Sequence, residues 1–457
     1  MKGNTFVGRP RYATQNRLSF LVIPLVLFLQ TNARAVVSVQ FSPATNYPCS
    51  AAGSLAVGDF NNDGKMDIVT MDYSFGHILF GKGGGRFSDV TDRPVQNASP
   101  NVVATGDFNN DGASDFVTGF SYGGCLLLGT NNNTFAQTNF IWSSSAYPQS
   151  VTVGDFNADG NPDIAQATGS GSSFVSVGFG RGNGAFDLPT NYVPASFVYS
   201  ADIVSGDVTG DGRLDLAVSL NNFSNSHSNS VCILTNRGDG VFGILKYYTA
   251  DPGDTHGSLL LGDFNGDGLL DLAVLDYNAM SVTIRLNLKH GDFGPARVIP
   301  LGFHPSSIVS ADFNGDGQLD LVVRGGPDAR ILPGNGDGTF GLGDLMTVPT
   351  DNFHHTTVAV GDFDGNGTPD LAFADSNGGS IAIMLNQTPP TLQITRMPGY
   401  NQISWRDTFG AGFALEYTTN LAGGDWQPFP YPPVVFNSQK AVADWADRGQ
   451  VFYRLRK

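Results

Sequence analysis

One ten-residue stretch, Gly-Asp-Phe-Asn-Gly-Asp-Gly-Leu-Leu-Asp at residues 262–271, recurs seven times with small changes in this 457-residue chain. A repeat of this length indicates a solenoid, a propeller or a similar array, and it constrains the fold more than any other feature of the chain. The copies follow one another at intervals of 48 to 56 residues, and they open at Asp59, Asp107, Asp155, Asp207, Asp263, Asp312 and Asp362.

Each copy carries oxygen-bearing side chains at positions one, three, five and nine, with glycine at position six. A hard cation such as calcium takes six to eight oxygen ligands, and a short loop that supplies them turns sharply at a glycine. The first half matches the pattern D-x-[DN]-x-[DN]-G of known calcium loops, whereas an aspartate at position nine replaces their closing glutamate. The sequence therefore predicts up to seven calcium ions, with these ligands: Asp59, Asn61, Asp63, Asp67, Asp107, Asn109, Asp111, Asp115, Asp155, Asn157, Asp159, Asp163, Asp207, Thr209, Asp211, Asp215, Asp263, Asn265, Asp267, Asp271, Asp312, Asn314, Asp316, Asp320, Asp362, Asp364, Asn366 and Asp370.

The segments around the loops have the pattern of β-strands. Each unit has an apolar run on either side of the acidic loop, then a third run and an outer strand, joined by glycine-rich turns. Four strands per unit, with almost no helical periodicity, favour the blades of a propeller. The last turn of each unit ends in phenylalanine, at residues 81–87, 129–135, 180–186, 236–242, 287–293 and 334–340.

These six turns accompany seven loops, so one unit is incomplete at its C-terminal end. Phe41 precedes the first loop by 18 residues, much as each turn phenylalanine precedes the next loop. We expect residues 37–47 to supply the outer strand of the last unit, which would remove two exposed strand edges. The predicted fold is all-β: a seven-bladed β-propeller at residues 36–388, completed by its N-terminal strand.

The loops and their flanking strands resemble the FG-GAP/VCBS repeat of integrin α-subunit propellers and of many secreted bacterial proteins. The resemblance covers roughly residues 36–388 and implies a calcium-bearing propeller with all loops on one face. It does not fix a function, because this fold serves adhesins, lectins and polysaccharide-cleaving enzymes.

Both ends of the chain differ from the repeats. Residues 1–35 have a basic start, an apolar run at 18–29 and an Ala-Arg-Ala sequence at 33–35, which predicts a cleaved signal peptide and a secreted or cell-surface protein. No other stretch is apolar enough to span a membrane. Residues 391–457 predict a small immunoglobulin- or fibronectin-like β-sandwich module, with its core formed by Trp405, Trp426, Trp445 and Tyr453.

Charge and motifs narrow the function. The formal net charge is −16, which argues against nucleic acid as a partner. Phosphate-binding, zinc-protease and serine-hydrolase motifs are absent from the sequence. The leading prediction is a monomeric binding or adhesion module for an extracellular glycan or protein.

A second set of residues suggests an alternative function. His256, His304, His354, His355, Tyr147 and Tyr199 lie seven or eight residues before the first aspartate of a loop. In propellers of the family that the chain resembles, this position lies at the rim of the central channel, opposite the calcium loops. The resemblance implies the same place for these six residues. They are either ordinary loop residues or the lining of one ligand pocket. The second interpretation is chemically reasonable because imidazole and phenol groups suit sugar binding and proton transfer. The alternative function is thus a polysaccharide-cleaving, lyase-like enzyme.

Overall fold

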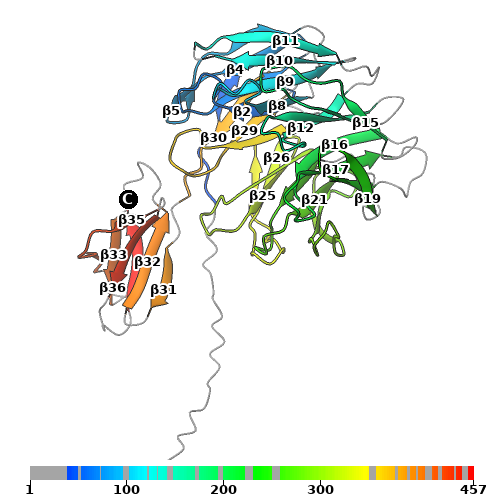
Figure 1. Ribbon diagram of the computed structural model, residues 1–457. Coiled ribbons are helices and arrows are strands. Elements are labelled where there is room, and N and C mark those ends of the chain that lie inside the picture. Colours follow the sequence, from blue (N-terminus) through cyan, green and yellow to red (C-terminus); the bar gives the residue numbers. More distant parts are fainter. Residues whose placement is uncertain are drawn as a thin grey trace, which may run out of the picture. The chain divides into compact units, whose positions relative to one another are not determined.

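The protein is all-β in the part of the chain that the computed structural model describes, which confirms the predicted fold class (Figure 1). No helix occurs among the described residues, and so none of them forms a helix suited to crossing a bilayer. The described residues are 39–49, 53–72, 74–95, 102–120, 123–130, 132–141, 148–169, 174–193, 199–221, 230–249, 258–348, 357–375, 379–388, 392–397, 400–406, 414–419, 425–436, 439–444 and 451–456.

Seven four-stranded antiparallel sheets each contain one of the acidic loops, between their first and second strands. The second strands are almost wholly buried, because apolar side chains on both of their faces meet neighbouring sheets. The first three sheets are β2 (Leu55–Gly58), β3 (Asp67–Met71), β4 (Phe75–Leu79) and β7 (Thr91–Pro94); β8 (Val103–Gly106), β9 (Asp115–Phe120), β10 (Gly123–Gly129) and β11 (Phe135–Ile141); and β12 (Pro148–Gly154), β13 (Asp163–Thr168), β14 (Val175–Gly178) and β15 (Thr190–Tyr192).

The next three sheets follow the same order. They are β16 (Tyr199–Gly206), β17 (Asp215–Asn221), β18 (Ser230–Asn236) and β19 (Phe242–Thr249); β20 (Leu259–Gly262), β21 (Asp271–Asp276), β22 (Ser281–Arg285) and β23 (Arg297–Pro300); and β24 (Ser307–Ala311), β25 (Asp320–Gly325), β26 (Asp328–Leu332) and β27 (Leu345–Thr347). The turn of the first repeat adds a small hairpin of β5 (Gly81–Gly83) and β6 (Arg86–Phe87).

The seventh sheet is assembled from both ends of the repeat region. Its first three strands are β28 (Thr357–Gly361), β29 (Asp370–Asp375) and β30 (Ser380–Met384), and its outer strand is β1 (Thr45–Pro48), which pairs antiparallel with β30. Phe41 forms an isolated bridge with Asn386, as the turn phenylalanines Phe186, Phe293 and Phe340 do within their own turns. The N-terminal segment thus takes the place of the missing turn.

The first strands of the seven sheets contact one another in a closed cycle, from β2 through β8, β12, β16, β20, β24 and β28 back to β2. The phenylalanine at position two of a loop packs edge-on against the turn phenylalanine of the next sheet. These contacts join neighbouring sheets through buried aromatic area, which stabilises their packing. The pairs are Phe60 with Phe135, Phe108 with Phe186, Phe156 with Phe242, Phe264 with Phe340, Phe313 with Phe41, and Phe363 with Phe87.

Two further sheets lie C-terminal to the repeats. One is β31 (Gln393–Met397), β32 (Tyr400–Arg406), β36 (Gln439–Asp444) and β35 (Val434–Phe436), and the other is β34 (Gln427–Pro428), β33 (Ala414–Thr418) and β37 (Phe452–Arg456). They share one apolar cluster that contains Ile403, Trp405, Leu415 and Val442, with Tyr453 packed against it.

The prediction of Trp426 as a core residue is wrong. Trp426 lies outside this cluster and is only half-buried, and the guanidinium of Arg454 lies 4.3 Å from its ring centroid. The ring therefore stacks with a cation that also pairs with Glu416. Trp445 is outside the described residues.

Candidate metal centre

The aspartate at position nine is the most deeply placed residue of each acidic loop, with no exposed surface in any of the seven copies. In the fifth copy, one carboxylate oxygen of Asp271 accepts the backbone N–H of Phe264 at 3.0 Å. The other oxygen accepts the N–H of Asn287, the first residue of the next turn, at 2.7 Å. The aspartate therefore ties its loop to the turn of the same sheet. The other copies are Asp67, Asp115, Asp163, Asp215, Asp320 and Asp370.

Burial acts strongly on the charge of these carboxyls. It raises their pKa, because the low-dielectric interior disfavours the ionised form, and the nearby aspartates of the same loop add to the rise, while the backbone hydrogen bonds oppose it. The pKa reaches about 7 at Asp67, Asp115, Asp320 and Asp370, reaches about 6 at Asp163 and Asp271, and is raised at Asp215. A cation bound beside such a carboxyl would restore its ionised form.

The remaining side-chain oxygens fold the loop around itself. In the fifth copy, Asp263 at position one accepts the backbone N–H groups of Asp267 and Gly268 at 3.1 and 2.9 Å. Asn265 at position three accepts the N–H of Asp267, and Asp267 at position five accepts that of Leu269, both at 2.9 Å. The same frame recurs in the first and second loops. All three side chains therefore turn toward the inside of the loop, where a hard cation would find oxygen ligands.

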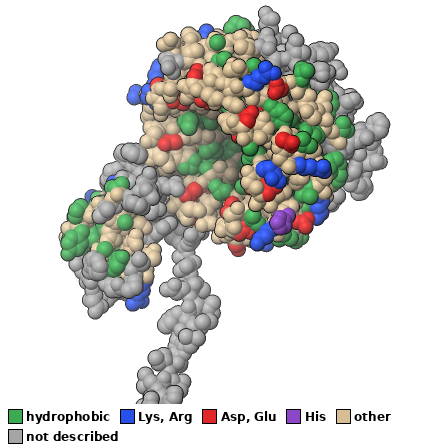
Figure 2. All heavy atoms as spheres, in the orientation of Figure 1, with side chains coloured by type: hydrophobic (Ala, Val, Ile, Leu, Met, Phe, Trp, Pro, Cys, Tyr) green, Lys and Arg blue, Asp and Glu red, His purple; other side chains and the backbone are tan. Residues whose placement is uncertain are grey.

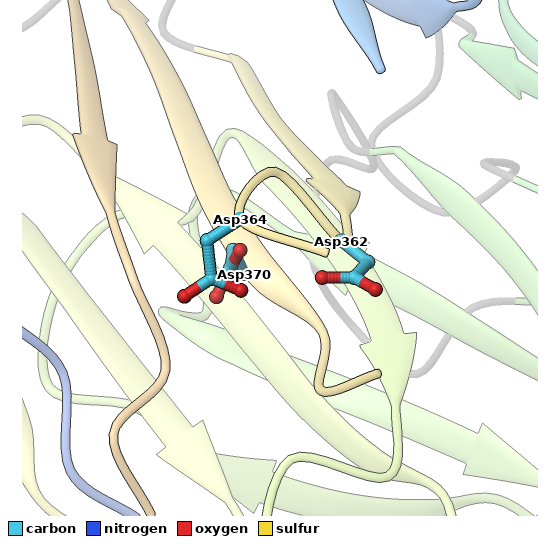
Figure 3. Close-up of side chains that lie close together, drawn as sticks. All are labelled: Asp362, Asp364 and Asp370. Carbon is cyan, nitrogen blue, oxygen red and sulfur yellow. The ribbon is translucent and has the colours of Figure 1, made fainter. Parts of the chain in front are cut away.

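The seventh loop brings three acidic side chains closest together. Asp362, Asp364 and Asp370 each place a carboxylate oxygen within 4.8 Å of the others, and no other group of three histidine, cysteine or acidic residues among the described residues meets this limit. Figure 3 shows the carboxylates of Asp364 and Asp370 side by side, with that of Asp362 facing them. Burial raises the pKa of Asp364 as well. Loop seven alone has an aspartate at position three, where five of the other loops have asparagine.

The fourth loop is the weakest candidate by ligand charge. Thr209 replaces asparagine at position three, and its Oγ1 atom is buried without a well-formed hydrogen bond in the described part of the chain. This oxygen nevertheless lies near enough to Asp215 to lower its pKa slightly against the effect of burial. A buried hydroxyl oxygen of this kind could serve as an uncharged ligand of a cation, because burying a hydroxyl without a partner is otherwise unfavourable.

Contacts that the sequence analysis missed join three of the loops to the following sheet. The side-chain amides of Asn236, Asn287 and Asn386 donate to the backbone carbonyls of Phe156, Val208 and Phe313, respectively, at 2.7 to 2.9 Å. Each carbonyl belongs to position two of the preceding loop. The only signal in the sequence was asparagine in place of glycine at the first position of two turns and at the equivalent position of the seventh unit. It did not reveal a partner 73 to 80 residues away.

The structure describes only part of the predicted histidine and tyrosine rim. His304 is exposed, its Nδ1 lies 2.7 Å from the carbonyl oxygen of Tyr277, and the two rings stack at 4.6 Å. Because a carbonyl only accepts, Nδ1 carries the proton. Tyr199 is the first residue of β16, and the other four rim residues, Tyr147, His256, His354 and His355, lie outside the described residues. Tyr277 was not predicted, since 27 residues separate it from His304.

Repeated antiparallel sheets around a cycle of first strands define a propeller-like, all-β repeat protein. Sequence comparison identifies the repeat: FG-GAP-like repeats match residues 59–118, 107–166, 222–274, 263–323 and 312–373, more than half of the chain. The chain belongs to the FG-GAP-like repeat family, which confirms the resemblance seen in the sequence. No curated protein gives a significant match.

Two solved structures share the fold at low sequence identity. A lectin from Agrocybe aegerita, described as recognising non-reducing terminal N-acetylglucosamine, has a TM-score of 0.51 and 17% identity, and the match covers 75% of this chain and 87% of the lectin. BBS1N, from a complex with ARL6DN soaked with lead, has a TM-score of 0.55 and 14% identity, and the match covers 78% of this chain and 98% of that one. Both likenesses concern the fold alone.

Proposed function

We propose that this protein is an exported, calcium-binding, seven-bladed β-propeller that binds an extracellular glycan or protein. The observation that carries the calcium proposal is the inward-turned set of oxygens in the acidic loops, above all the three carboxylates of Asp362, Asp364 and Asp370. Three carboxylates at this separation repel one another unless a cation lies among them. Calcium would supply the compensating charge, and the loop residues would hold it in place.

The proposed organisation follows from the chain itself. Residues 1–35 would direct export, residues 36–388 would form the seven blades, and residues 391–457 would form a small β-sandwich. The closed contacts of the first strands and the N-terminal outer strand β1 support the ring. Extracellular calcium, at about millimolar levels, would fill sites with dissociation constants on the order of 10⁻⁴–10⁻³ M.

The binding role is supported by the fold and by one structural neighbour. A lectin that is described as recognising terminal N-acetylglucosamine shares this fold. The chain would bind its ligand through loops presented on a rigid frame. Neither a zinc-protease nor a hydrolase motif occurs in the sequence, which is consistent with a binding protein.

A glycan-array experiment tests this function. Residues 36–457 would be applied to an array that includes terminal N-acetylglucosamine, first with 2 mM calcium, on the order of extracellular levels, and then with a chelator. Selective, saturable binding to one group of glycans supports the proposal. A complete lack of binding to both the array and a panel of extracellular proteins would overturn it. Release of shortened glycan would instead favour the lyase-like alternative.

A further inference from the structure

The turn at residues 287–293 in the fifth repeat departs from the pattern of the other turns. Its third position is Lys289, whereas the first, third, fourth and sixth repeats have glycine there: Gly83, Gly182, Gly238 and Gly336. All four glycines have positive φ angles, between 64° and 96°, and Lys289 has a φ of 92°. Residues with a side chain rarely adopt this conformation, so Lys289 places backbone strain in the turn.

The neighbouring positions of this turn are unusual too. Leu288 occupies the second position, where the other repeats have lysine, threonine, arginine or asparagine, and 64% of its surface is exposed. His290 occupies the fourth position, where the fourth and sixth repeats have Asp239 and Asp337. Leu288, Lys289 and His290 are all exposed. The third and fourth positions therefore carry basic side chains only in this turn, beside an apolar second position, whereas the first, third and fourth turns have a basic residue at the second position.

The turn is held firmly in place by the fourth sheet. The hydroxyl of Tyr248 on β19 donates to the carbonyl of Gly291 and accepts the backbone N–H of Phe293, both at 2.9 Å. Lys246 forms an ion pair with Asp292 at 2.5 Å. A tip anchored at its base in this way loses little conformational freedom when a partner binds.

Further cations and apolar side chains lie on the strands next to this turn, β19, β22 and β23. Lys246 and Arg285 lie 5.1 and 5.9 Å from the ring centroid of Tyr248. Leu245 on β19 and Val298 on β23 are 45% and 49% exposed, and a Cβ added to Gly291 would lie 2.8 Å from the Leu245 side chain. Figure 2 shows Lys and Arg side chains and a histidine, with Asp and Glu side chains among them, around the region where Figure 1 draws β17 and β21. Lys246, Arg285 and Lys289 outnumber the one carboxylate of this turn, Asp292, which pairs with Lys246. The surface is therefore basic and apolar on a chain with a net charge of −16.

We propose that the fifth-repeat turn and the adjoining parts of β19 and β23 form a docking surface for an acidic peptide segment of a protein partner, one that also carries aliphatic side chains. Lysine and arginine attract carboxylates and steer their approach, which is unusual on so acidic a protein. Exposed leucine and valine offer nothing to the hydroxyl groups of a glycan, whereas they pack well against aliphatic side chains. This surface specifies the partner for the protein-binding form of the proposed function, on which it rests, and it requires neither the glycan nor the calcium proposal.

Restoring the ordinary turn separates recognition from folding. The double variant Lys289→Gly/His290→Asp gives the fifth turn the Gly-Asp-Gly tip of the fourth and sixth turns, and it removes the strained lysine. We expect an unchanged or higher Tm, together with at least tenfold weaker binding of a fluorescent peptide of alternating glutamate and leucine. Fluorescence anisotropy of the full chain at low and high salt measures the Kd. Equal affinity of the variant and the native chain would overturn the proposal.

A matched control places lysine and histidine in the fourth turn, where we do not expect them to strengthen peptide binding. Gly238→Lys/Asp239→His transfers the Lys-His pair to the fourth turn, and we expect a lower Tm with peptide affinity unchanged. A separate variant, Leu288→Asn, copies Asn335 of the sixth turn and should weaken the peptide several-fold even at high salt. If heparin or phosphatidylglycerol vesicles bind the native chain while the peptide does not, the occupant is not a peptide and the proposal fails.

Discussion

The fourth and seventh repeats share one backbone frame and differ in what that frame carries. In both, a buried aspartate, Asp215 or Asp370, accepts the backbone N–H of the asparagine at or just after the end of the third strand, Asn236 or Asn386, at 2.7 to 2.8 Å. The fourth repeat is one continuous segment with a neutral threonine at position three, and the seventh is assembled from both ends and has Asp364 there. Backbone hydrogen bonds thus fix the loop in both repeats, and we expect the side-chain charge at position three to set the affinity of each loop for a cation.

The largest effect should come from the buried aspartates, and it should be equal in the two repeats. Asp215→Ala and Asp370→Ala each leave two buried backbone donors unsatisfied, which costs about 2–6 kcal/mol at about 1–3 kcal/mol per donor. Urea denaturation in the presence of a chelator measures the free energy of unfolding. A small loss in either variant would show that the shared frame does not depend on this carboxylate.

The next effect tests how the two repeats are closed. Phe242→Ala removes a phenylalanine that is 5% exposed in the fourth repeat, and a buried Phe→Ala change costs about 3–5 kcal/mol. Phe41→Ala makes the corresponding change in the seventh repeat and should cost less, because Phe41 is only half-buried. Thermal denaturation compares them. An unaffected Tm in Phe41→Ala would mean that the N-terminal segment does not hold the seventh sheet.

Calcium should stabilise the seventh repeat more than the fourth. A single site contributes about 2.7 kcal/mol when free calcium is 100 times its Kd. We expect Asp364→Asn to reduce the calcium-dependent rise in Tm, and Thr209→Asp to increase it. Calorimetry with and without calcium gives both shifts. Identical shifts in the two variants would remove the proposed difference in affinity.

The last effect is the pH dependence of stability, which the buried aspartates of all the loops share. The folded pKa of the buried aspartates, about 6 to 7 in six copies, lies above the ordinary aspartate pKa of 3.8, so the folded state binds more protons between these values. Unfolding free energy should therefore fall as pH rises from about 4 to about 7 in chelated protein. With calcium bound, the ionised form is favoured, and this fall should disappear. A Tm series from pH 5 to 8 distinguishes the two cases.

The repetition made the all-β fold and the family predictable from the sequence. Seven copies in phase define strand, loop and turn together. The last unit lacks a turn phenylalanine, and the spacing of Phe41 from the first loop identified it as the replacement. Contacts between distant segments were not predictable. Tyr277 under His304 and Asn287 against Val208 depend on how neighbouring sheets meet, which no local pattern encodes. The C-terminal module, without a repeat, gave Trp405 correctly and Trp426 wrongly, because aromatic content alone does not say which face of a strand a side chain takes.

Anomalous diffraction from crystals grown in calcium tests the central claim most directly, since it locates each bound ion without reference to activity. We expect calcium peaks inside the acidic loops, strongest beside Asp362, Asp364 and Asp370 and weakest beside Thr209. Ordered loops with the described hydrogen bonds and no anomalous peak at any of the seven would contradict it.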